Sequence, residues 1–460
     1  LVVGTQPSLT LTQEGGTNLN ITLDTEKDGV ATFKVATQKT SAMGEYDLKA
    51  SLTVNGAVLT DSAKIKYVPY KFAVANQQVV AGKKNTVSIT VKVCAQDGKV
   101  VTTGYTGQPS VDFTYLLDSL KHPAVKDVRD LGFDPQFRGG STSAEMRFKE
   151  SGKIKVSLRD ANFTCDPTQY RCPMNGGALK GEFEVSARPW KIAICDIKSK
   201  SDSKVVNPAT KGSGKGFIAS GEKFSMTYRP VIHPDSSGGY LPCDSNYPIT
   251  SNYGLDNGKS SVDHILVYPN HDYAWRGQLE PRDFPVSFDK DHLTRTIDYS
   301  WNEVGTLKIE TKAKYLGMDI ETDTQEVGRF YPKYFKVLDG VKPKWDYPGS
   351  EKTEQDFMYM NQPFDGLEFQ VEALNAQEVY LNNYGLFDPR LTANFSVYEA
   401  SSGLSRRFHS VTPSKHWERT TIKGNILGHS IGTFKWNNST NSTDCSKSLC
   451  WVKAISGDSY

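Results

Sequence analysis

The chain has 460 residues, which is too long for one ordinary domain and indicates about three or four. Hydrophobic residues make up 37% of it, and its 38 glycines and 22 prolines favour many turns around modest cores. With 54 basic and 52 acidic residues the formal charge is +2, which argues against a nucleic-acid or anionic-membrane partner. No stretch approaches about 18 consecutive apolar residues, so we expect no transmembrane helix. Because the chain begins at Leu1 without a signal-peptide pattern, we interpret it as an excised or processed piece.

Alternating polar and apolar residues recur in pairs of segments along the chain. Such alternation predicts antiparallel strands with one face on a core and one face in water. In each pair we expect a hairpin, since a glycine near the start of the second strand suits a tight turn. The paired segments are 29–35 with 44–54, 144–148 with 152–160, and 297–301 with 305–311.

Prolines interrupt the strand pattern at three places and suggest domain boundaries there. Repeated hairpins without a fixed period predict an all-β chain of serial antiparallel, immunoglobulin-like β-sandwich domains in an elongated rod. Residues 116–131 could hold one or two helical turns, and 199–216 and 233–258 have loop compositions. The predicted domains are an immunoglobulin-like sandwich at 1–68, a second one at 69–188, a sandwich with long loops at 189–330, and a C-terminal sandwich at 331–460, the candidate binding domain.

Seven cysteines point to an exported protein with loop-stapling disulfides. Cys165 with Cys172 and Cys445 with Cys450 each enclose a short loop of turn-forming residues. Zinc would require shorter knuckles in matched pairs or nearby histidines, and a catalytic thiol would require a histidine partner. We therefore predict disulfides in an oxidising, extracellular compartment. A longer third bridge between Cys195 and Cys243 would leave Cys94 without an assigned partner.

One segment has the composition of a carbohydrate-binding loop. Aromatic rings stack on sugar rings, while amide, carboxylate and guanidinium groups bond to sugar hydroxyls. The alternative is that these aromatic residues are half-buried packing beside a strand. The candidate carbohydrate-binding residues are Asn270, His271, Asp272, Tyr273, Trp275 and Arg276.

A group of carboxylates follows this segment at Asp283, Asp289 and Asp291. Carboxylate oxygens are suitable calcium ligands, so calcium is a possible cofactor, although the spacing matches no EF-hand loop. Paired carboxylates near aromatic residues would also be needed by a secreted glycoside-active enzyme. A solvated turn between strands is the simpler interpretation, and no nucleophile motif or phosphate-binding loop supports catalysis. We therefore expect a non-enzymatic protein.

The chain from Arg188 to the end resembles MshQ-like proteins, which are encoded with the mannose-sensitive haemagglutinin (MSHA) type IV pilus of Vibrio, Shewanella and relatives. Residues 1–67 are similar to bacterial immunoglobulin-like repeats of the invasin type. The long and unusual motifs at 328–332 (Gly-Arg-Phe-Tyr-Pro) and 359–364 (Tyr-Met-Asn-Gln-Pro-Phe) are the most specific parts of the resemblance. The other segments that carry it are 188–190, 194–195, 219–224, 369–376 and 383–385.

The resemblance implies a secreted bacterial surface protein associated with the MSHA pilus, plausibly an adhesin at its tip. Its partners would be pilus subunits or minor pilins and, through loops at sandwich ends, host or surface glycans. It supplies no catalytic residues. The alternatives are a structural spacer or pilus-biogenesis component whose binding domain lies outside this sequence, and the glycoside-active enzyme with accessory sandwiches.

Overall fold

The structure is a computed structural model, and its strands form a row of four β units. We describe residues 8–12, 20–27, 30–36, 44–54, 56–67, 69, 71–92, 104–121, 126–162, 168, 178–338, 367–394, 408–409, 414–421, 428–436 and 450–451. The fold is all-β, as predicted, and the pairs between its strands are antiparallel except where β15 meets β6 and β7. Among these residues no helix has the length and apolar character needed to span a membrane.

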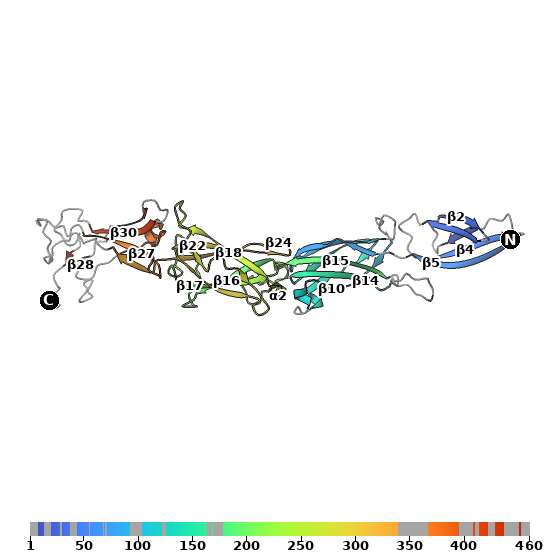
Figure 1. Cartoon of the computed structure of the whole chain (residues 1–460), viewed down its shortest axis with the longest axis horizontal. Helices are drawn as coiled ribbons and strands as arrows, with labels where there is room; N and C mark the ends of the chain where they lie inside the picture. Colours follow the sequence, from blue (N-terminus) through green and yellow to red (C-terminus); the bar gives the residue numbers. More distant parts are fainter. Residues whose placement is uncertain are drawn as a thin grey trace.

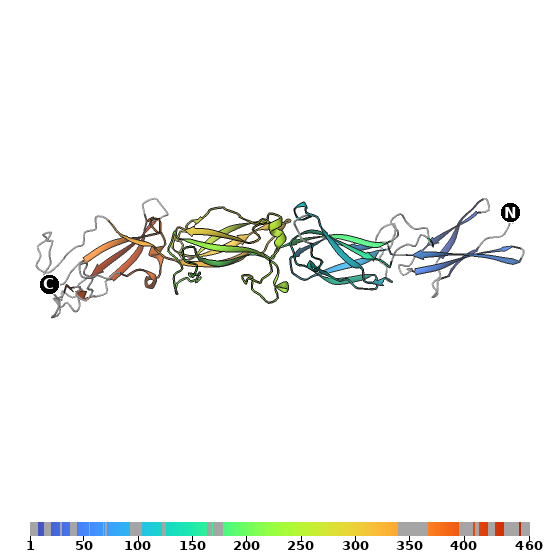
Figure 2. The ribbon, with the colours of Figure 1, turned by 90° about the horizontal axis from the view of Figure 1, so that it is seen from below.

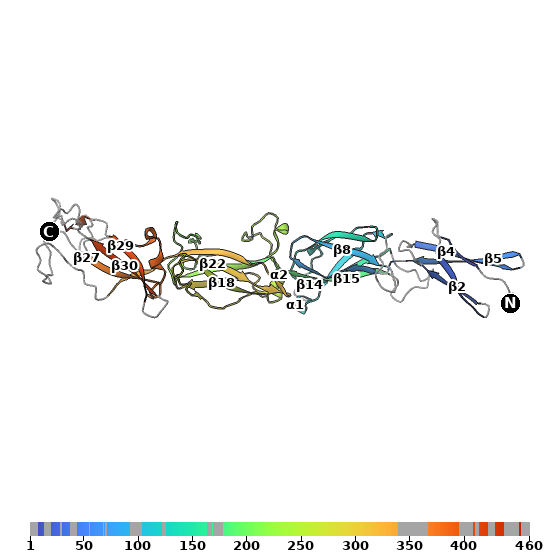
Figure 3. The ribbon, with the colours of Figure 1, turned by 90° about the horizontal axis from the view of Figure 1, so that it is seen from above.

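The units follow one another along a single long axis. Strands β4 and β5 lie at one end and β30 at the other (Figure 1). Seen from below and from above, the strands of the second and third units run roughly along this axis (Figures 2 and 3). The predicted rod is therefore the observed arrangement.

The first unit contains two small sheets, ordered β1-β4-β5 and β2-β3. Its strands are β1 (Ser8–Thr12), β2 (Asn20–Lys27), β3 (Val30–Ala36), β4 (Gly44–Val54) and β5 (Ala57–Tyr67).

The second unit has one sheet path, β10-β14-β15-β6-β8-β13-β11, which closes around a core that includes Phe113, Phe148 and Phe183. Two short helices, α1 (Asp118–Lys121) and η1 (Val128–Asp130), fall where helical turns were predicted. The strands are β6 (Lys71–Val74), β7 (Gln77–Val80), β8 (Asn85–Lys92), β9 (Thr106–Gly107), β10 (Ser110–Tyr115), β11 (Leu131–Phe133), β12 (Phe137–Arg138), β13 (Ser141–Phe148), β14 (Gly152–Asp160) and β15 (Leu179–Arg188).

The third unit is a sandwich of two four-stranded sheets, β16-β17-β21-β19 and β20-β18-β22-β25, around a core centred on Phe224, Trp301 and Phe330. Its helices are η2 (Pro234–Ser236) and α2 (Ser251–Leu255), and its strands are β16 (Lys191–Ser199), β17 (Lys223–Val231), β18 (Lys259–Tyr268), β19 (Leu279–Glu280), β20 (Val286–Ser287), β21 (Arg295–Trp301), β22 (Gly305–Lys312), β23 (Lys314–Tyr315), β24 (Met318–Asp319) and β25 (Asp323–Phe330).

The fourth unit is built on the sheet β26-β27-β30-β29, whose core includes Trp417 and Phe434. Its elements are β26 (Tyr334–Val337), β27 (Leu367–Leu374), η3 (Tyr384–Leu386), η4 (Pro389–Leu391), β28 (Phe408–His409), β29 (Ser414–Thr421), β30 (Gly428–Trp436) and β31 (Cys450–Trp451).

The predicted hairpins are wrong in all three places, although the strands themselves are present. β13 pairs with β8 and β11, whereas β14 pairs with β10 and β15. β21 and β22 likewise belong to opposite sheets of the third sandwich, and β3 and β4 do not pair with each other. The glycine turns therefore pass the chain from one group of strands to another, and we call 149–152 and 302–305 the two corners. Gly152 and Gly305 begin the second strands at φ +128° and +126°, a conformation that favours glycine.

One of the predicted disulfides is confirmed. Cys195 on β16 is bonded to Cys243 in the long loop between β17 and β18, with a Cα–Cα distance of 5.3 Å. The other predicted pairs lie outside the described residues, except that Cys450 forms part of β31. Cys94 also lies outside them.

Candidate functional site

A cavity of about 350 Å³ opens beside β18 in the third unit, and it contains several of the predicted residues. Trp275 and Arg276 line it, and Asp283 lines it from the following loop. The size is within the range of small-ligand sites in proteins. It is therefore the place where the structure brings together residues from the predicted carbohydrate loop and the aspartate group.

The polar side of this cavity is a network around Arg276. Its Nη2 donates to Asp263 Oδ1, and its guanidinium contacts the ring of His264. Burial would raise the pKa of Asp263, but the His264 N–H bond and the charges of Arg276 and Lys312 outweigh it and lower that pKa. Burial, followed by the Arg276 charge, lowers the pKa of His264. At neutral pH the cavity thus offers an ionised carboxylate, a guanidinium and a neutral imidazole.

Aromatic side chains form the apolar side of the cavity. Phe284 is 50% exposed, and Trp275 is half-buried. An exposed ring beside hydrogen-bonding groups can bind the apolar face of a sugar while its hydroxyls meet the polar side. Asp263 is poorly suited as a general acid, because its lowered pKa keeps it ionised.

The rest of the predicted carbohydrate loop lies outside the cavity lining. Asn270, His271, Asp272 and Tyr273 are exposed. The loop also contacts the fourth unit: Asn383 Nδ2 donates to the carbonyl of Trp275 at 2.7 Å, and Trp275 N donates to Asn383 Oδ1 at 2.8 Å. Part of this loop therefore contacts the fourth unit through its main chain.

The three predicted calcium ligands do not form a metal site. Asp289 accepts hydrogen bonds from Asp291 N and contacts His292 Nδ1 within one exposed turn, and Asp291 pairs with Lys290. Asp283 faces the cavity instead. Throughout the described parts of the chain no three His, Cys, Asp or Glu side chains are grouped so as to hold a metal ion.

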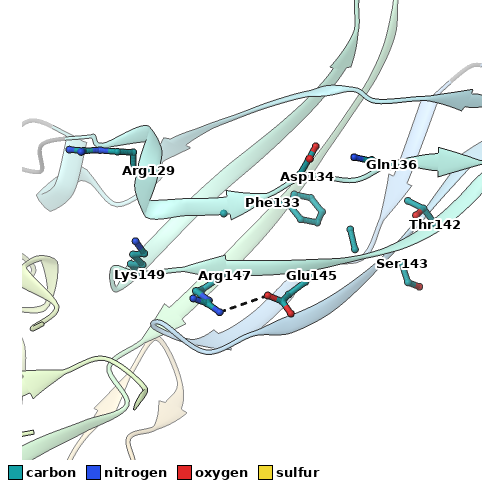
Figure 4. A pocket seen from close by; sticks show the side chains of 11 residues that line it. Arg129, Phe133, Asp134, Gln136, Thr142, Ser143, Glu145, Arg147 and Lys149 are labelled. Carbon is teal, nitrogen blue, oxygen red and sulfur yellow. Dashed lines mark ion pairs between the residues drawn. The ribbon is translucent and has the colours of Figure 1, made fainter. Parts of the chain in front are cut away.

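A larger hollow of about 710 Å³ lies on the second unit over β11 and β13. Figure 4 shows Arg147 beside Glu145 on β13, with Arg129 and Lys149 farther along the same side. The aromatic ring in its lining, Phe133, is only 8% exposed. The hollow therefore offers charged groups but little stacking surface, and it does not match the predicted sugar chemistry.

The junction between the second and third units is built from buried polar contacts. The carboxylate of Glu150, in the first corner, accepts N–H bonds from Ser251 at 3.2 Å and Asn252 at 3.1 Å at the start of α2. The side chain of Asn252 returns across the boundary, donating to Tyr115 Oη and to the carbonyl of Ser151. Since these partners belong to different units, the contacts restrain one unit against the other.

A second set of contacts at this junction comes from the loop that contains Cys243. His233 N donates to the carbonyl of Ala81 at 2.8 Å, and Ser236 Oγ donates to that of Gly82 at 2.8 Å. Ala81 and Ile232 share a small apolar cluster with Cys195. The disulfide thus anchors the loop through which the third unit contacts the second.

The junction between the third and fourth units follows the same plan. Glu303, in the second corner, is fully buried and accepts N–H bonds from Asn382 at 2.6 Å and Asn383 at 2.8 Å. The next residue, Val304, is a member of the fourth unit's core. Ala376 N also donates to the carbonyl of Ser220 at 2.9 Å. A side chain of one unit inside the core of the next makes a large independent motion of the two units unfavourable.

Glu150 and Glu303 are the structurally important residues that the sequence reasoning missed. Each corner follows a strand that ends on a buried aromatic residue, Phe148 or Trp301, and each ends on a glycine. A glutamate two residues after a strand looks like an ordinary solvated turn. The recurrence of aromatic-x-Glu-x-Gly was the available signal.

The solved structures similar to this chain include tandem-domain and surface proteins. Domains A168–A170 of titin are 10% identical, with 70% of this chain and 89% of that chain covered and a TM-score of 0.24. The D00–D0 domain of intimin is 8% identical, with 56% and 98% covered and a TM-score of 0.21. Domains 4–9 of the surface layer protein SbsC are 12% identical, with 72% and 48% covered and a TM-score of 0.19. A comparison with curated proteins found no match.

Two family models match the region that carries both the cavity and the second corner. Residues 188–296 match the second domain of DUF6701, and residues 303–444 match its third domain. The gap between the models, 297–302, covers most of β21 and so falls inside the third sandwich. Together the two models cover more than half of the chain, which therefore belongs to the DUF6701 family.

Proposed function

We propose that this protein is a non-enzymatic bacterial surface adhesin of the MSHA-type pilus, in which the second to fourth units form a stiff shaft. It is exported and extracellular, its partners are pilus subunits or minor pilins, and it attaches to host or surface glycans. The observation that carries the proposal is the construction of both junctions from buried contacts between units. A protein that transmits tension along its length benefits from joints that resist bending.

The disulfide and the direction of the strands support the same proposal. Cys195–Cys243 is stable in an oxidising compartment and anchors the loop at the first junction. The strands of the middle units run along the rod axis (Figure 2). A pull on the ends would therefore load many interstrand hydrogen bonds together.

Glycan binding is assigned to the cavity beside β18. The test is a glycan array with the purified chain, repeated for W275A and for Y240A as a matched control. Tyr240 is 46% exposed in another loop of the same unit and lies outside the cavity lining. We expect binding to defined sugars that W275A weakens at least about fivefold and Y240A leaves unchanged, since loss of one stacking ring costs about 1 kcal/mol or more.

A spacer is the second candidate, and one observation favours it. The predicted binding loop contributes Trp275 and Tyr273 to the junction with the fourth unit, so the same residues have a structural use. Under this alternative the array shows no binding in calcium or in chelator, while deletion of the gene still abolishes attachment of the bacteria. An array without binding, together with bacterial attachment that survives deletion of the gene, would contradict both candidates.

A further inference from the structure

The two junctions share their sequence as well as their plan. With the aromatic residue that precedes each, the corners read Phe-Lys-Glu-Ser-Gly at 148–152 and Trp-Asn-Glu-Val-Gly at 301–305. The segments that receive them read Ser-Asn-Tyr-Gly-Leu at 251–255 and Asn-Asn-Tyr-Gly-Leu at 382–386. In both, the carboxylate accepts the N–H groups of the first two residues, and the tyrosine that follows is buried.

The repeated contact joins segments that are far apart in sequence and belong to successive units. The receiving segment begins a short helical element each time, α2 in the third unit and η3 in the fourth. Free N–H groups at the start of such an element need acceptors, and the carboxylate from the preceding unit supplies them. We call each pair of a corner and its receiving segment a joint.

Neither glutamate has a basic partner. Among the described residues no Lys, Arg or His side chain forms an ion pair with Glu150 or Glu303. The titratable groups facing Glu150 are Asp130 on η1, Tyr115 on β10 and Tyr315 on β23. An ionised carboxylate in this position is thus compensated by N–H dipoles alone, which makes its burial unfavourable.

The second joint contains an acceptor that a proton would satisfy. Glu303 is faced by uncharged groups, namely the N–H groups of Asn382, Asn383 and Val304 and the Asn382 side chain. Asn382 Oδ1 is buried without a hydrogen-bond partner among the described residues. A carboxylic acid at Glu303 could donate to an amide oxygen and still accept an N–H bond through its other oxygen.

We propose that these corners and receiving segments form one repeated joint, and that protonation of its glutamate closes the joint while ionisation loosens it. The shaft is then stiffest when both carboxyls are neutral and becomes bent and mobile at the joints as they ionise.

The surroundings of both carboxyls put this change near neutral pH. Burial is the largest influence on each; it raises the pKa of Glu150 to about 7 and that of Glu303 to about 8, against the lowering effect of the N–H bonds. The Asp130 charge also raises the pKa of Glu150. Glu150 is partly exposed whereas Glu303 is fully buried, so the first joint loosens at the lower pH.

Small-angle X-ray scattering of the full chain from pH 5.5 to 9 tests the proposal. We expect a rigid-rod distance distribution at pH 5.5 that shortens and broadens by pH 9. The variant E150Q/E303Q, whose amides imitate the neutral acids, should keep the rod distribution at both ends of the range. The matched control is E182Q/E184Q, which removes two carboxylates from the exposed face of β15 and should behave like the wild type.

Hydrogen exchange supplies a local readout for the same samples. After correction for the intrinsic effect of pH, amides of Ser251, Asn252, Asn382 and Asn383 should exchange at least about tenfold faster at pH 9 than at pH 5.5 in the wild type and in E182Q/E184Q, but not in E150Q/E303Q. Circular dichroism confirms folding, and E150Q alone is used if the double variant does not fold. Wild-type scattering that is unchanged across the range, or a pH response retained by E150Q/E303Q, would overturn the proposal. The result does not depend on glycan binding.

Discussion

Replacing Glu303 with glutamine removes a titrating carboxyl. We expect this variant, E303Q, to change how the stability of the third and fourth units depends on pH. Burial raises the pKa of this carboxyl from 4.5 to about 8. The folded protein therefore holds the proton more tightly than the unfolded chain does. Stability is greatest below the ordinary pKa, falls as pH rises from about 4.5 to about 8, and is constant above that range.

The size of the effect follows from the pKa difference. At about 1.4 kcal/mol for each unit of pKa, the shift corresponds to a loss of roughly 5 kcal/mol in the free energy of unfolding across that range. For a unit of this size, about 2–4 °C of melting temperature accompanies each kcal/mol. The melting temperature of the third and fourth units in the wild type should therefore fall by about 10–20 °C as pH rises through this range.

Differential scanning calorimetry of the full chain at five pH values from 5 to 9 measures this loss. A chain of several units gives several transitions, so the comparison is between variants at the same pH. E303Q should melt with the wild type at pH 5 and above it at pH 9, whereas the exposed control E182Q should follow the wild type. Parallel curves for the wild type and E303Q would refute the reasoning, because the carboxyl would then titrate alike in both states.

Two further perturbations test other parts of the structure. The Cys195–Cys243 bridge spans a sequence separation of 48, for which loop entropy predicts about 4 kcal/mol of stabilisation; C195S/C243S should lower the melting temperature, and a wild-type melting temperature unaffected by strong reductant would contradict a structural role. A Cβ on Gly305 would lie 2.0 Å from the carbonyl oxygen of Tyr268 at φ +126°, so G305A should destabilise the third unit by at least about 2 kcal/mol. The control G132A, whose Cβ meets nothing closer than 3.8 Å, should cost less than about 1 kcal/mol, and equal losses in the two variants would reject the strain argument.

Alternation in the sequence was enough to find the strands on both sides of each corner. β14 buries every second residue from Gly152 to Asp160, as its pattern predicts. Alternation reports which side chains share a face, but it contains no information on which strand lies alongside. A tight glycine turn can close a hairpin or cross between sheets, and only the partners of β21 and β22 distinguish these outcomes.

The candidate site shows the same division. Trp275 and Arg276 were identified by composition, and they do line a cavity. His264 and Phe284, which complete that cavity, have no local signal and come from a separate strand and loop. The part of the loop used at the junction could not be foreseen, since Asn383 lies 108 positions later in the chain.

The sequence by itself therefore determined the all-β class and the serial arrangement of units, because alternation and turn residues are local properties. It offered Cys195 and Cys243 as a bridge, but only the fold brings these two distant positions together. Only the tertiary structure decided the roles of Glu150 and Glu303. A glutamate in a turn is solvated by default, and its burial depends on N–H groups that the next unit presents about 80 to 100 residues farther on. Burial and hydrogen bonding across a boundary are properties of the assembled chain, so they appear only when both units are in place.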